Sequence, residues 1–423
     1  MEYKKRVADS LLEQKLRRNG AVLIEGPKWC GKTTTAEQQA SSILYMTDPS
    51  TMKQNLEMAK INIGQLLQGD SSRLIDEWQV TPQFWDAIRF DVDHREGRGF
   101  YILTGSSVPP NPEDIVHSGA GRFGKLKMRT MSLWESGDSQ GSVSLADLFD
   151  GKEISCATSA SDILNIAYLI CRGGWPGVLS LSQEDALGQA FDYYDVVVET
   201  DMARLYKTRR NPQRVRLLMR SYARHQGTQA NISAIIKDMK VNESEELSDN
   251  TIYNYINALK DLFVIEDMPA WNPNLRSKAA IRTSDTRYFV DPSIATAALG
   301  LGPNDLINNL EYMGFLFEAM CARDLRVYAE ALDGNVYHYR DSDNQECDAV
   351  IHLRDGRYGL VEVKLGGDNR IEEGAMSLKK MNRKIDSTKM REPSFMMVLT
   401  GVGQYAYKRA DGVYVVPVTL LKP

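Results

Sequence analysis

The chain has 423 residues, 43% hydrophobic and 25% charged, which is the composition of an ordinary soluble globular protein. Because this length is too great for a single hydrophobic core, we expect two to four domains. The net charge of −5 gives no support to a protein that coats nucleic acid over its whole surface. No apolar run approaches the roughly eighteen residues that a membrane span needs, so no membrane partner is expected.

The cysteines and the N-terminus indicate a cytoplasmic protein. The five cysteines are scattered and none belongs to a Cys-x-x-Cys pair, which argues against a disulfide framework or a zinc site. The basic residues at the start lead into Leu11–Leu16, which predicts an amphipathic helix and not a signal peptide, since no apolar stretch follows.

A phosphate-binding loop is the most specific motif of the chain. It has the full G-x-x-x-x-G-K-T pattern, in the order Gly26, Pro27, Lys28, Trp29, Cys30, Gly31, Lys32 and Thr33. The apolar run Ala21–Ile24 precedes it and a predicted helix follows, so its backbone N–H groups could wrap the phosphates of ATP. We expect Lys32 to reach the β and γ phosphates, the Thr33 hydroxyl to ligate Mg²⁺, and Thr34 to complete the nucleotide site. The alternative is a chance glycine turn.

A short apolar strand over 73–76 is predicted to supply the acidic partner of this loop. It ends in adjacent carboxylates, of which Asp76 is expected to hold Mg²⁺ and Glu77 to polarise the attacking water. A buried strand that ends in a solvated acidic pair is the alternative.

The strand Phe100–Thr104 and the loop that contains Arg122 supply further polar candidates. Either Thr104 or Ser106 is expected to sense the γ phosphate, unless the Gly-Ser-Ser stretch is a simple turn. Arg122 lies between glycines in a loop expected at the carboxyl edge of the parallel sheet, where ligands bind. There it could stabilise transition-state charge or report the nucleotide state to a neighbouring element. An ordinary surface arginine is the alternative.

A resemblance to a family of prokaryotic AAA-type ATPases is carried by five stretches, GPKWCGKTTT, LIDEWQ, ILTGSS, GRFGKLKMRTMSLWE and GGWP. Members of this family join an ATPase core to a C-terminal domain of unknown function, and the similarity runs in order along nearly the whole chain. The resemblance implies nucleotide-binding and hydrolysis roles for four residues, Lys32, Thr33, Asp76 and Glu77. The pair Trp29-Cys30 departs from the smaller aliphatic residues that are usual in the family.

Helical patterns fill the middle of the chain. The apolar spacing over 151–206 predicts a helical lid over the nucleotide. Helices predicted at 231–239 and 248–260, followed by a hairpin, form the pattern of a winged helix over 207–290. In DNA-binding versions the start of the second helix faces base edges, and the residues there are Asp249, Asn250, Thr251 and Asn254.

The segment 205–290 is basic, with fourteen Lys and Arg against nine Asp and Glu. The basic block Arg209–Arg224 predicts a phosphate-contacting surface, and a solvated helix face is the alternative. Acidic residues just before the second helix suit a DNA backbone poorly, so a winged helix used only for packing has equal weight.

A charged hairpin is predicted in the C-terminal region. Asp348, thirteen residues and then Glu362-x-Lys364 fit the PD-(D/E)xK nuclease pattern. If Gly356 takes the left-handed position of a three-residue loop, Asp348 lies opposite Glu362 and both share a face with Lys364. Two facing carboxylates favour a divalent cation between them, and Lys364 would orient water or stabilise the phosphorane. A two-residue loop would break this register, and a solvated hairpin is the alternative.

The family resemblance implies a restriction-endonuclease-like fold for this region and adds Glu318 as an accessory carboxylate. The patterns predict an α/β P-loop NTPase with a parallel sheet over 1–150, a helical lid over 151–206 and a winged helix over 207–290. With the family resemblance, they also imply an α/β restriction-endonuclease-like domain over 291–423.

The leading hypothesis is a Mg²⁺-dependent ATPase that acts on DNA and whose ATP state controls the nuclease-like domain. The rival is a nucleotide-dependent regulatory or scaffold protein that contacts other proteins. A small-molecule phosphotransferase is a third alternative, disfavoured because no acceptor pocket is indicated.

Overall fold

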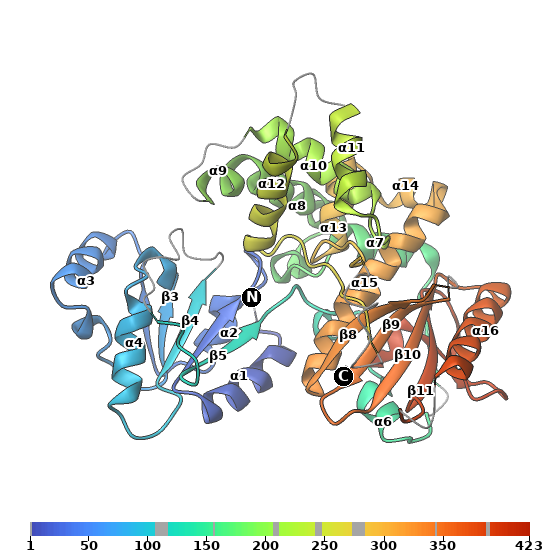
Figure 1. The fold of residues 1–423 in the computed structure, drawn as a ribbon, viewed down its shortest axis with the longest axis horizontal. Coiled ribbons are helices and arrows are strands. Elements are labelled where there is room, and N and C mark those ends of the chain that lie inside the picture. The colour runs from blue at the N-terminus through green and yellow to red at the C-terminus, as the bar shows by residue number, and fades with distance from the viewer. Residues whose placement is uncertain are drawn as a thin grey trace. The chain divides into compact units, whose positions relative to one another are not determined.

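The computed structural model describes residues 2–105, 117–154, 157–205, 211–241, 248–272, 284–342, 345–385 and 390–423. The chain divides into two compact units, each with its own β-sheet (Figure 1). The first unit contains Met1–Thr130, Asp201–Arg210 and Asn257–Val264. The second contains Met131–Thr200, Asn211–Ile256 and Ile265–Pro423. We find no candidate for a transmembrane helix within the described ranges.

The parallel sheet predicted for the ATPase region is present in the first unit. Its strand order is β2-β3-β4-β1-β5, with bounds Ala21–Glu25 (β1), Ser42–Tyr45 (β2), Arg73–Asp76 (β3), Tyr101–Gly105 (β4) and Phe123–Lys127 (β5). Glu25 is paired with Gly105 and Lys127, and Asp76 is paired with Thr104. The carboxyl ends of four strands therefore finish together at one edge.

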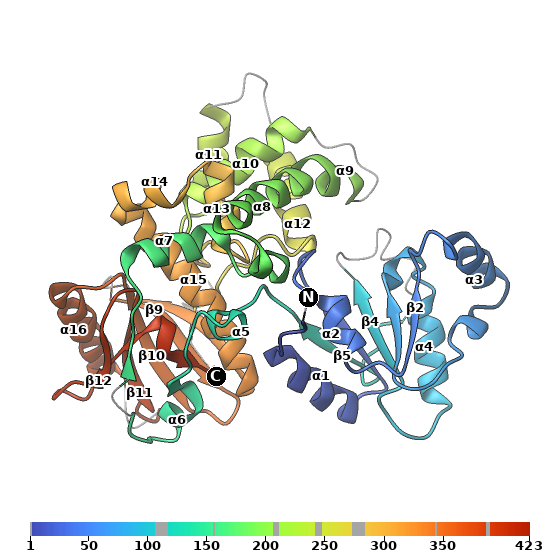
Figure 2. The ribbon, with the colours of Figure 1, turned by 180° about the vertical axis from the view of Figure 1, so that it is seen from behind.

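Helices cover both faces of this sheet, as Figure 1 and the view from behind in Figure 2 show. They are α1 (Val7–Arg18), α2 (Lys32–Glu37), α3 (Met52–Leu66) and α4 (Phe84–Asp93). Because side chains alternate along a strand, Leu23 packs in the core with α3 and α4. Its neighbours Val22 and Ile24 pack in the opposite core with α1. The helix predicted around Leu11–Leu16 is thus confirmed.

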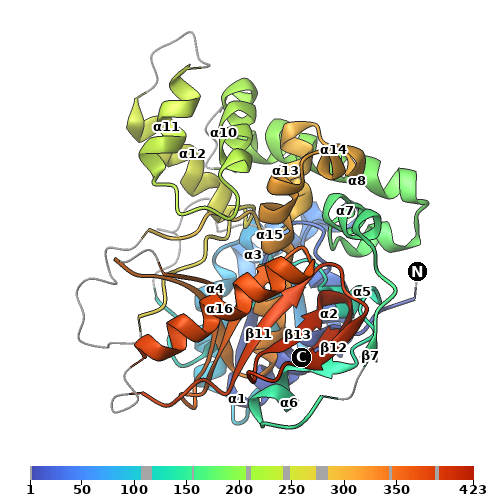
Figure 3. The ribbon, with the colours of Figure 1, turned by 90° about the vertical axis from the view of Figure 1, so that its right-hand side faces the viewer.

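The second unit contains a mixed sheet in the order β7-β12-β13-β11-β10-β9-β8. The strand bounds are Ala157–Thr158 (β7), Gly334–Arg340 (β8), Glu346–Leu353 (β9), Tyr358–Lys364 (β10), Phe395–Thr400 (β11), Tyr405–Lys408 (β12) and Tyr414–Pro417 (β13). Helix α16 (Asp368–Lys384) lies along this sheet in Figure 3, with Ala375 and Leu378 packed against Leu360 and Val398. Helix α15 (Leu310–Ala331) also packs on β8, β9 and β10.

Helices confirm the helical patterns of the middle region, namely α7 (Ile163–Arg172), α8 (Gln183–Val196), α10 (Pro212–Arg224), α11 (Ile232–Val241) and α12 (Asp249–Asp261). Residues Asn257–Asp261 of α12 belong to the first unit. The second unit also contains α13 (Pro292–Leu299) and α14 (Pro303–Asn308). Helices α7 and α8, expected as a lid, pack on α13 and α14. After α12, antiparallel bridges join Ile265 to Phe289 and Met268 to Thr286.

The N-terminal segment of the first unit ends at Thr130, whereas a domain boundary was expected at 150. Residues beyond Thr130 pair with strands from the end of the chain, because β6 (Val143–Ser144) lies beside β14 (Leu421–Lys422) and β7 lies beside β12. Strands of two residues have no hydrophobic period, so their partners could not be inferred from local sequence.

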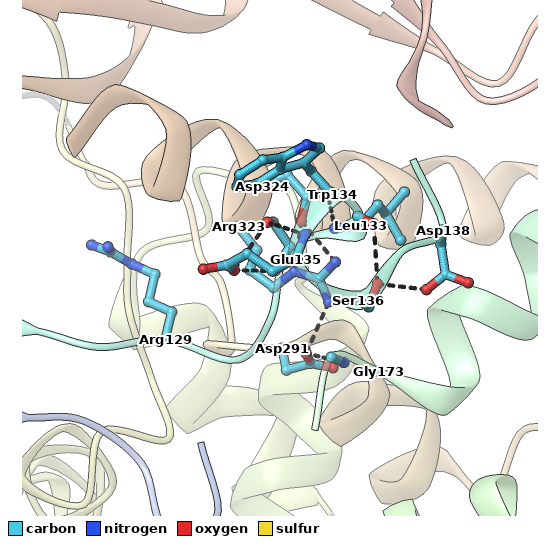
Figure 4. A network of polar contacts seen from close by, with 12 residues as sticks. Arg129, Leu133, Trp134, Glu135, Ser136, Asp138, Gly173, Asp291, Arg323 and Asp324 are labelled. Carbon is cyan, nitrogen blue, oxygen red and sulfur yellow. Dashed lines mark hydrogen bonds and ion pairs between the residues drawn. The ribbon is translucent and has the colours of Figure 1, made fainter. Parts of the chain in front are cut away.

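A buried ionic network holds several distant stretches of the second unit on α15 (Figure 4). The Arg323 guanidinium, 2% exposed, binds Asp291 at 3.0 Å and Asp324 at 2.7 Å. Asp324 also accepts a hydrogen bond from the backbone N–H of Leu133, and Asp291 accepts one from Gly174. The Ser-Leu-Trp-Glu and Gly-Gly-Trp-Pro stretches are therefore fixed to the same charged cluster.

Candidate active site

The phosphate-binding loop connects β1 to α2 at the carboxyl edge of the first sheet. Gly26 has no room for a side chain, since a Cβ would lie 2.1 Å from the carbonyl oxygen of Met128. Gly31 has φ 95°, a left-handed conformation that glycine adopts readily. The two glycines of the motif are thus required by the backbone path of the loop.

Two threonine hydroxyls meet at Asp76. Its Oδ1 accepts hydrogen bonds of 2.7 Å from the Thr33 hydroxyl and 2.7 Å from the Thr104 hydroxyl. The phosphate-binding loop and the end of β3, which were both predicted to hold Mg²⁺, are therefore in direct contact. Hydroxyl and carboxylate oxygens are ligands that Mg²⁺ prefers, so Thr33 and Asp76 fit the predicted ion. Thr104 contacts this junction, whereas Ser106 lies outside the described residues.

The lysines of the loop have different partners. Lys32 is buried, and its Nζ donates to the carbonyl oxygens of Gly26 at 2.9 Å and Pro27 at 2.7 Å. Lys28 is more exposed, and its Nζ donates to the buried carboxylate of Asp201 at 2.5 Å. Lys32 is thus held within the loop, while Lys28 ties the loop to a residue far along the chain.

The other loop residues that were predicted to contact the nucleotide differ in solvent exposure. The Trp29 side chain is 50% exposed and its φ is 69°, a left-handed value uncommon for a residue other than glycine. Cys30 is completely buried, and Thr34 is exposed. Half of the surface of the bulky Trp29 is therefore exposed to solvent.

Glu77 follows β3 in a left-handed conformation, with φ 55°. Burial, followed by the negative charge of Asp76, raises the pKa of Glu77 above its usual value. The Gln79 amide donates a hydrogen bond from Nε2 to Glu77 Oε2. Glu77 is thus a carboxylate with increased proton affinity beside the loop, which suits a general base.

Arg122 does not lie at the predicted edge of the sheet. It precedes Phe123, which pairs with Ala21 at the start of β1, and its Nε donates to Asp93 at 2.7 Å. The phosphate-binding loop follows the other end of β1, about 16 Å away for a five-residue strand. The prediction was wrong because a loop that enters a parallel strand lies at the amino edge, opposite the ligand-binding edge.

The hairpin register predicted for the C-terminal region is confirmed. Leu353 N–H donates to the Arg357 carbonyl at 2.8 Å, and Gly356 has a left-handed φ of 86°. The ladder continues through Ala349 paired with Val361, which brings Asp348 opposite Glu362. The three-residue loop therefore sets the facing positions as the sequence predicted.

Asp348, Glu362 and Lys364 are in contact through the lysine. Lys364 Nζ lies 2.7 Å from Glu362 Oε2 and 3.4 Å from Asp348 Oδ2. Burial lowers the pKa of Lys364, but the charges of Asp348 and Glu362 outweigh this effect and raise it above its usual value. In the part of the chain that the structure describes, no three His, Cys, Asp or Glu side chains are grouped to hold a metal ion. The cation that the structure places against both carboxylates is the lysine.

Ser377 touches this cluster and Tyr288 binds the accessory carboxylate Glu318, and neither residue followed from the sequence patterns. The Ser377 hydroxyl of α16 donates to Glu362 Oε1 at 3.0 Å. The Tyr288 hydroxyl donates to Glu318, whose pKa is raised well above its usual value by complete burial and then by the charge of Asp348. Both contacts depend on how a helix packs beside a strand or loop, so no local spacing could have indicated them.

The cluster predicts a dependence of stability on pH. Burial and then Asp348 raise the pKa of Glu362 to about 8, from 4.5 in the unfolded chain. The folded state binds this proton more tightly than the unfolded chain does, so protonation of Glu362 stabilises the fold. This contribution to the free energy of unfolding is complete below pH 4.5 and is lost as the pH rises through 8. We expect the free energy of unfolding to decline over this window and Glu362→Gln to flatten the decline. Urea unfolding at several pH values measures it.

The exposed residue Glu373, which pairs with Arg370 on α16, provides the control. Glu373→Gln should leave the slope of stability against pH as in the wild type. A slope that is equally steep after Glu362→Gln would contradict the assignment.

Carboxylates occupy much of the predicted basic surface. Arg216 binds Asp195 at 2.8 Å and Glu199 at 2.7 Å, and Arg224 binds Asp238 at 2.9 Å. Arg209 and Arg210 lie outside the described residues. At the start of α12, Asp249 binds Lys240 at 2.7 Å, while Asn250 and Asn254 are exposed. The charge available for phosphate contact is thus smaller than the sequence count suggests.

A G-x-x-x-x-G-K-T loop at the carboxyl edge of a parallel sheet, bonded through its threonine to the aspartate of a neighbouring strand, defines a P-loop nucleotide-binding domain. Residues 18–136 match the family model described as an AAA domain. The chain therefore carries an AAA-type P-loop ATPase domain.

The rest of the chain matches two domains of unknown function, DUF8612 over residues 164–305 and DUF4143 over 313–421. The chain is 23% identical over 368 residues to uncharacterized proteins of Mycobacterium bovis (Mb2031c) and Mycobacterium tuberculosis (Rv2008c), covering 86% of this chain and 74% of theirs.

Two solved structures are similar to this chain at lower sequence identity. A Walker-type ATPase of Pyrococcus abyssi has a TM-score of 0.42 and 14% identity, covering 69% of this chain and 94% of its own. The ORC2 protein of Aeropyrum pernix has a TM-score of 0.33 and 13% identity, covering 70% and 94%. Similarity at this level does not define a function.

Proposed function

We propose that the first unit hydrolyses ATP with Mg²⁺ and that its nucleotide state controls the second unit. The observation that carries the first part is the junction of Thr33, Asp76 and Thr104, which unites the phosphate-binding loop with two strand ends. ATP turnover by the wild type and by a Glu77→Gln variant tests it.

Each residue of the site has a distinct role in this proposal. Lys32 binds the β and γ phosphates, and Thr33 and Asp76 hold Mg²⁺. The ion, when bound, neutralises phosphate charge during transfer. Glu77 accepts the proton of the attacking water, and Thr104 reports the terminal phosphate through Asp76. Arg122, at the opposite edge, has no role within its own site.

The second unit is proposed to act on DNA. The order of α11, α12 and the antiparallel bridges supports a winged helix, and the exposed Asn250 and Asn254 would face the bases. The cluster of Asp348, Glu362 and Lys364 would act on a phosphodiester, with Lys364 stabilising developing negative charge. The roles of Asp348 and Glu362 as metal ligands stay a prediction, because a metal would have to displace Lys364.

Lys364→Ala is expected to reduce DNA cutting by about 100-fold or more, since removal of one positioned charge from a transition state costs this much. The assay incubates the full chain with ATP, Mg²⁺ or Mn²⁺, and linear or branched DNA. Lys152→Ala, which removes an exposed lysine paired with Asp147, is the matched control and should cut as the wild type does.

The second candidate function is a nucleotide-dependent regulator without nuclease activity. The pairing of Lys364 with both carboxylates and of Arg216 and Arg224 with acidic side chains favours it. Absence of cutting of every DNA form by the wild-type chain, with ATP turnover intact, would select this function.

A further inference from the structure

The side-chain amide of Gln79 forms a hydrogen bond through its nitrogen but none through its oxygen, among the described residues. It lies in a short 3-10 helix, Trp78–Val80, two residues after Glu77, and is 8% exposed. Its Nε2 donates to the Glu77 carboxylate, whereas its Oε1 is buried and accepts no hydrogen bond from the described residues. Buried amide oxygens normally have a donor, so this atom requires an explanation.

Gly105 lies directly against this oxygen. A Cβ built on Gly105 would come within 2.5 Å of Gln79 Oε1. Gly105 ends β4 immediately after Thr104, which is bonded to Asp76. The Gln79 amide therefore extends from Glu77 to the strand end that carries the proposed phosphate sensor.

We propose that Gln79 is a positioning residue for ATP hydrolysis, with Nε2 holding the Glu77 carboxylate and Oε1 accepting a hydrogen bond from the attacking water. This inference rests on the proposed function of the first unit. A water molecule has two hydrogens, and two adjacent acceptors with different tasks would orient it. Glu77 faces the hydrogen that leaves, and Gln79 faces the one that stays.

In the proposed hydrolysis, Glu77 and Gln79 each contact one hydrogen of the attacking water. The water oxygen forms a bond to the γ phosphorus, and the bond between that phosphorus and the β–γ bridging oxygen breaks. The electron pair of the broken bond remains on ADP. One water proton moves to Glu77, and the other remains on the phosphate product. Gln79 neither gains nor loses a proton.

The variant Gln79→Met keeps length and apolar volume but removes both hydrogen-bonding groups. We expect kcat for ATP to fall by about 100-fold, as misplacement of a reacting group does, with KM within about twofold of the wild type. Gln79→Glu keeps an acceptor near Gly105 but loses the donor to Glu77 and sets a second carboxylate beside it, so it should not recover the lost kcat. Gly105→Ala should displace Oε1 and reproduce the defect of Gln79→Met. The exposed Gln83, mutated to Met, is the matched control and should leave kcat unchanged.

A double-variant cycle separates positioning from packing. If Gln79 acts through Glu77, Gln79→Met should lower kcat little further in a Glu77→Gln background. Wild-type kcat in Gln79→Met, or a raised KM with unchanged kcat, would overturn the proposal. Wild-type turnover in Glu77→Gln alone would instead remove the general base on which the inference rests. Circular dichroism and urea unfolding of each variant verify that the fold is intact.

Discussion

Glu77→Gln is expected to lower kcat for ATP hydrolysis by about 100- to 10,000-fold, the usual contribution of a general base. The amide keeps the size of the carboxylate but cannot accept the water proton. ATP should still bind, because Lys32, Thr33 and Asp76 are unchanged. Steady-state turnover and equilibrium binding of a fluorescent ATP analogue measure the two quantities separately.

Glu13→Gln provides the comparison, because Glu13 is an exposed residue of α1 that pairs with Arg17. It should turn over ATP as the wild type does. Turnover that is also unchanged in Glu77→Gln would remove Glu77 from the mechanism, and loss of ATP binding would indicate a role in the nucleotide site instead.

Arg323→Ala is expected to lower the free energy of unfolding of the second unit by about 3–5 kcal/mol. The variant leaves Asp291 and Asp324 buried without their cation, and Asp324 is completely buried. Burial already raises the pKa of Asp324 to about 6, so the remaining carboxylates would take up protons in part. Urea unfolding followed by fluorescence and circular dichroism measures the loss.

The comparison variant is Arg370→Ala, which removes an exposed guanidinium paired with Glu373 on α16. An exposed pair contributes about 1 kcal/mol or less, so this variant should unfold close to the wild type. Equal effects of the two substitutions would show that the buried network does not hold the second unit together.

Short sequence motifs were sufficient to predict the candidate metal-site residues of the P-loop and the register of the C-terminal hairpin. The P-loop motif and the acidic end of β3 predicted that Thr33 and Asp76 would hold the same Mg²⁺, and the two side chains are in direct contact. The hairpin register followed from Gly356, because a left-handed residue in a three-residue loop determines which residues face each other. For the hairpin, a few consecutive residues define the geometry.

Other features depend on residues far apart in the chain. Arg122 was placed at the wrong edge because its loop enters β5, and the motif itself does not carry that direction. The contact of Lys364 with both carboxylates depends on side-chain conformations that spacing cannot supply. The network around Arg323 joins stretches that lie far apart in the chain, as in the bond between Leu133 and Asp324, and no periodicity indicates such a partner.

The chain passes between the two units several times, which limits how the units can be exchanged by recombination during evolution. The chain leaves the first unit at Thr130, returns at Asp201–Arg210 and again at Asn257–Val264, and β6 pairs with residues near Pro423. No single crossover in the gene could exchange one unit for a homologous one without splitting the other. The ATPase and its partner unit are therefore expected to diverge together, and not as independently shuffled modules.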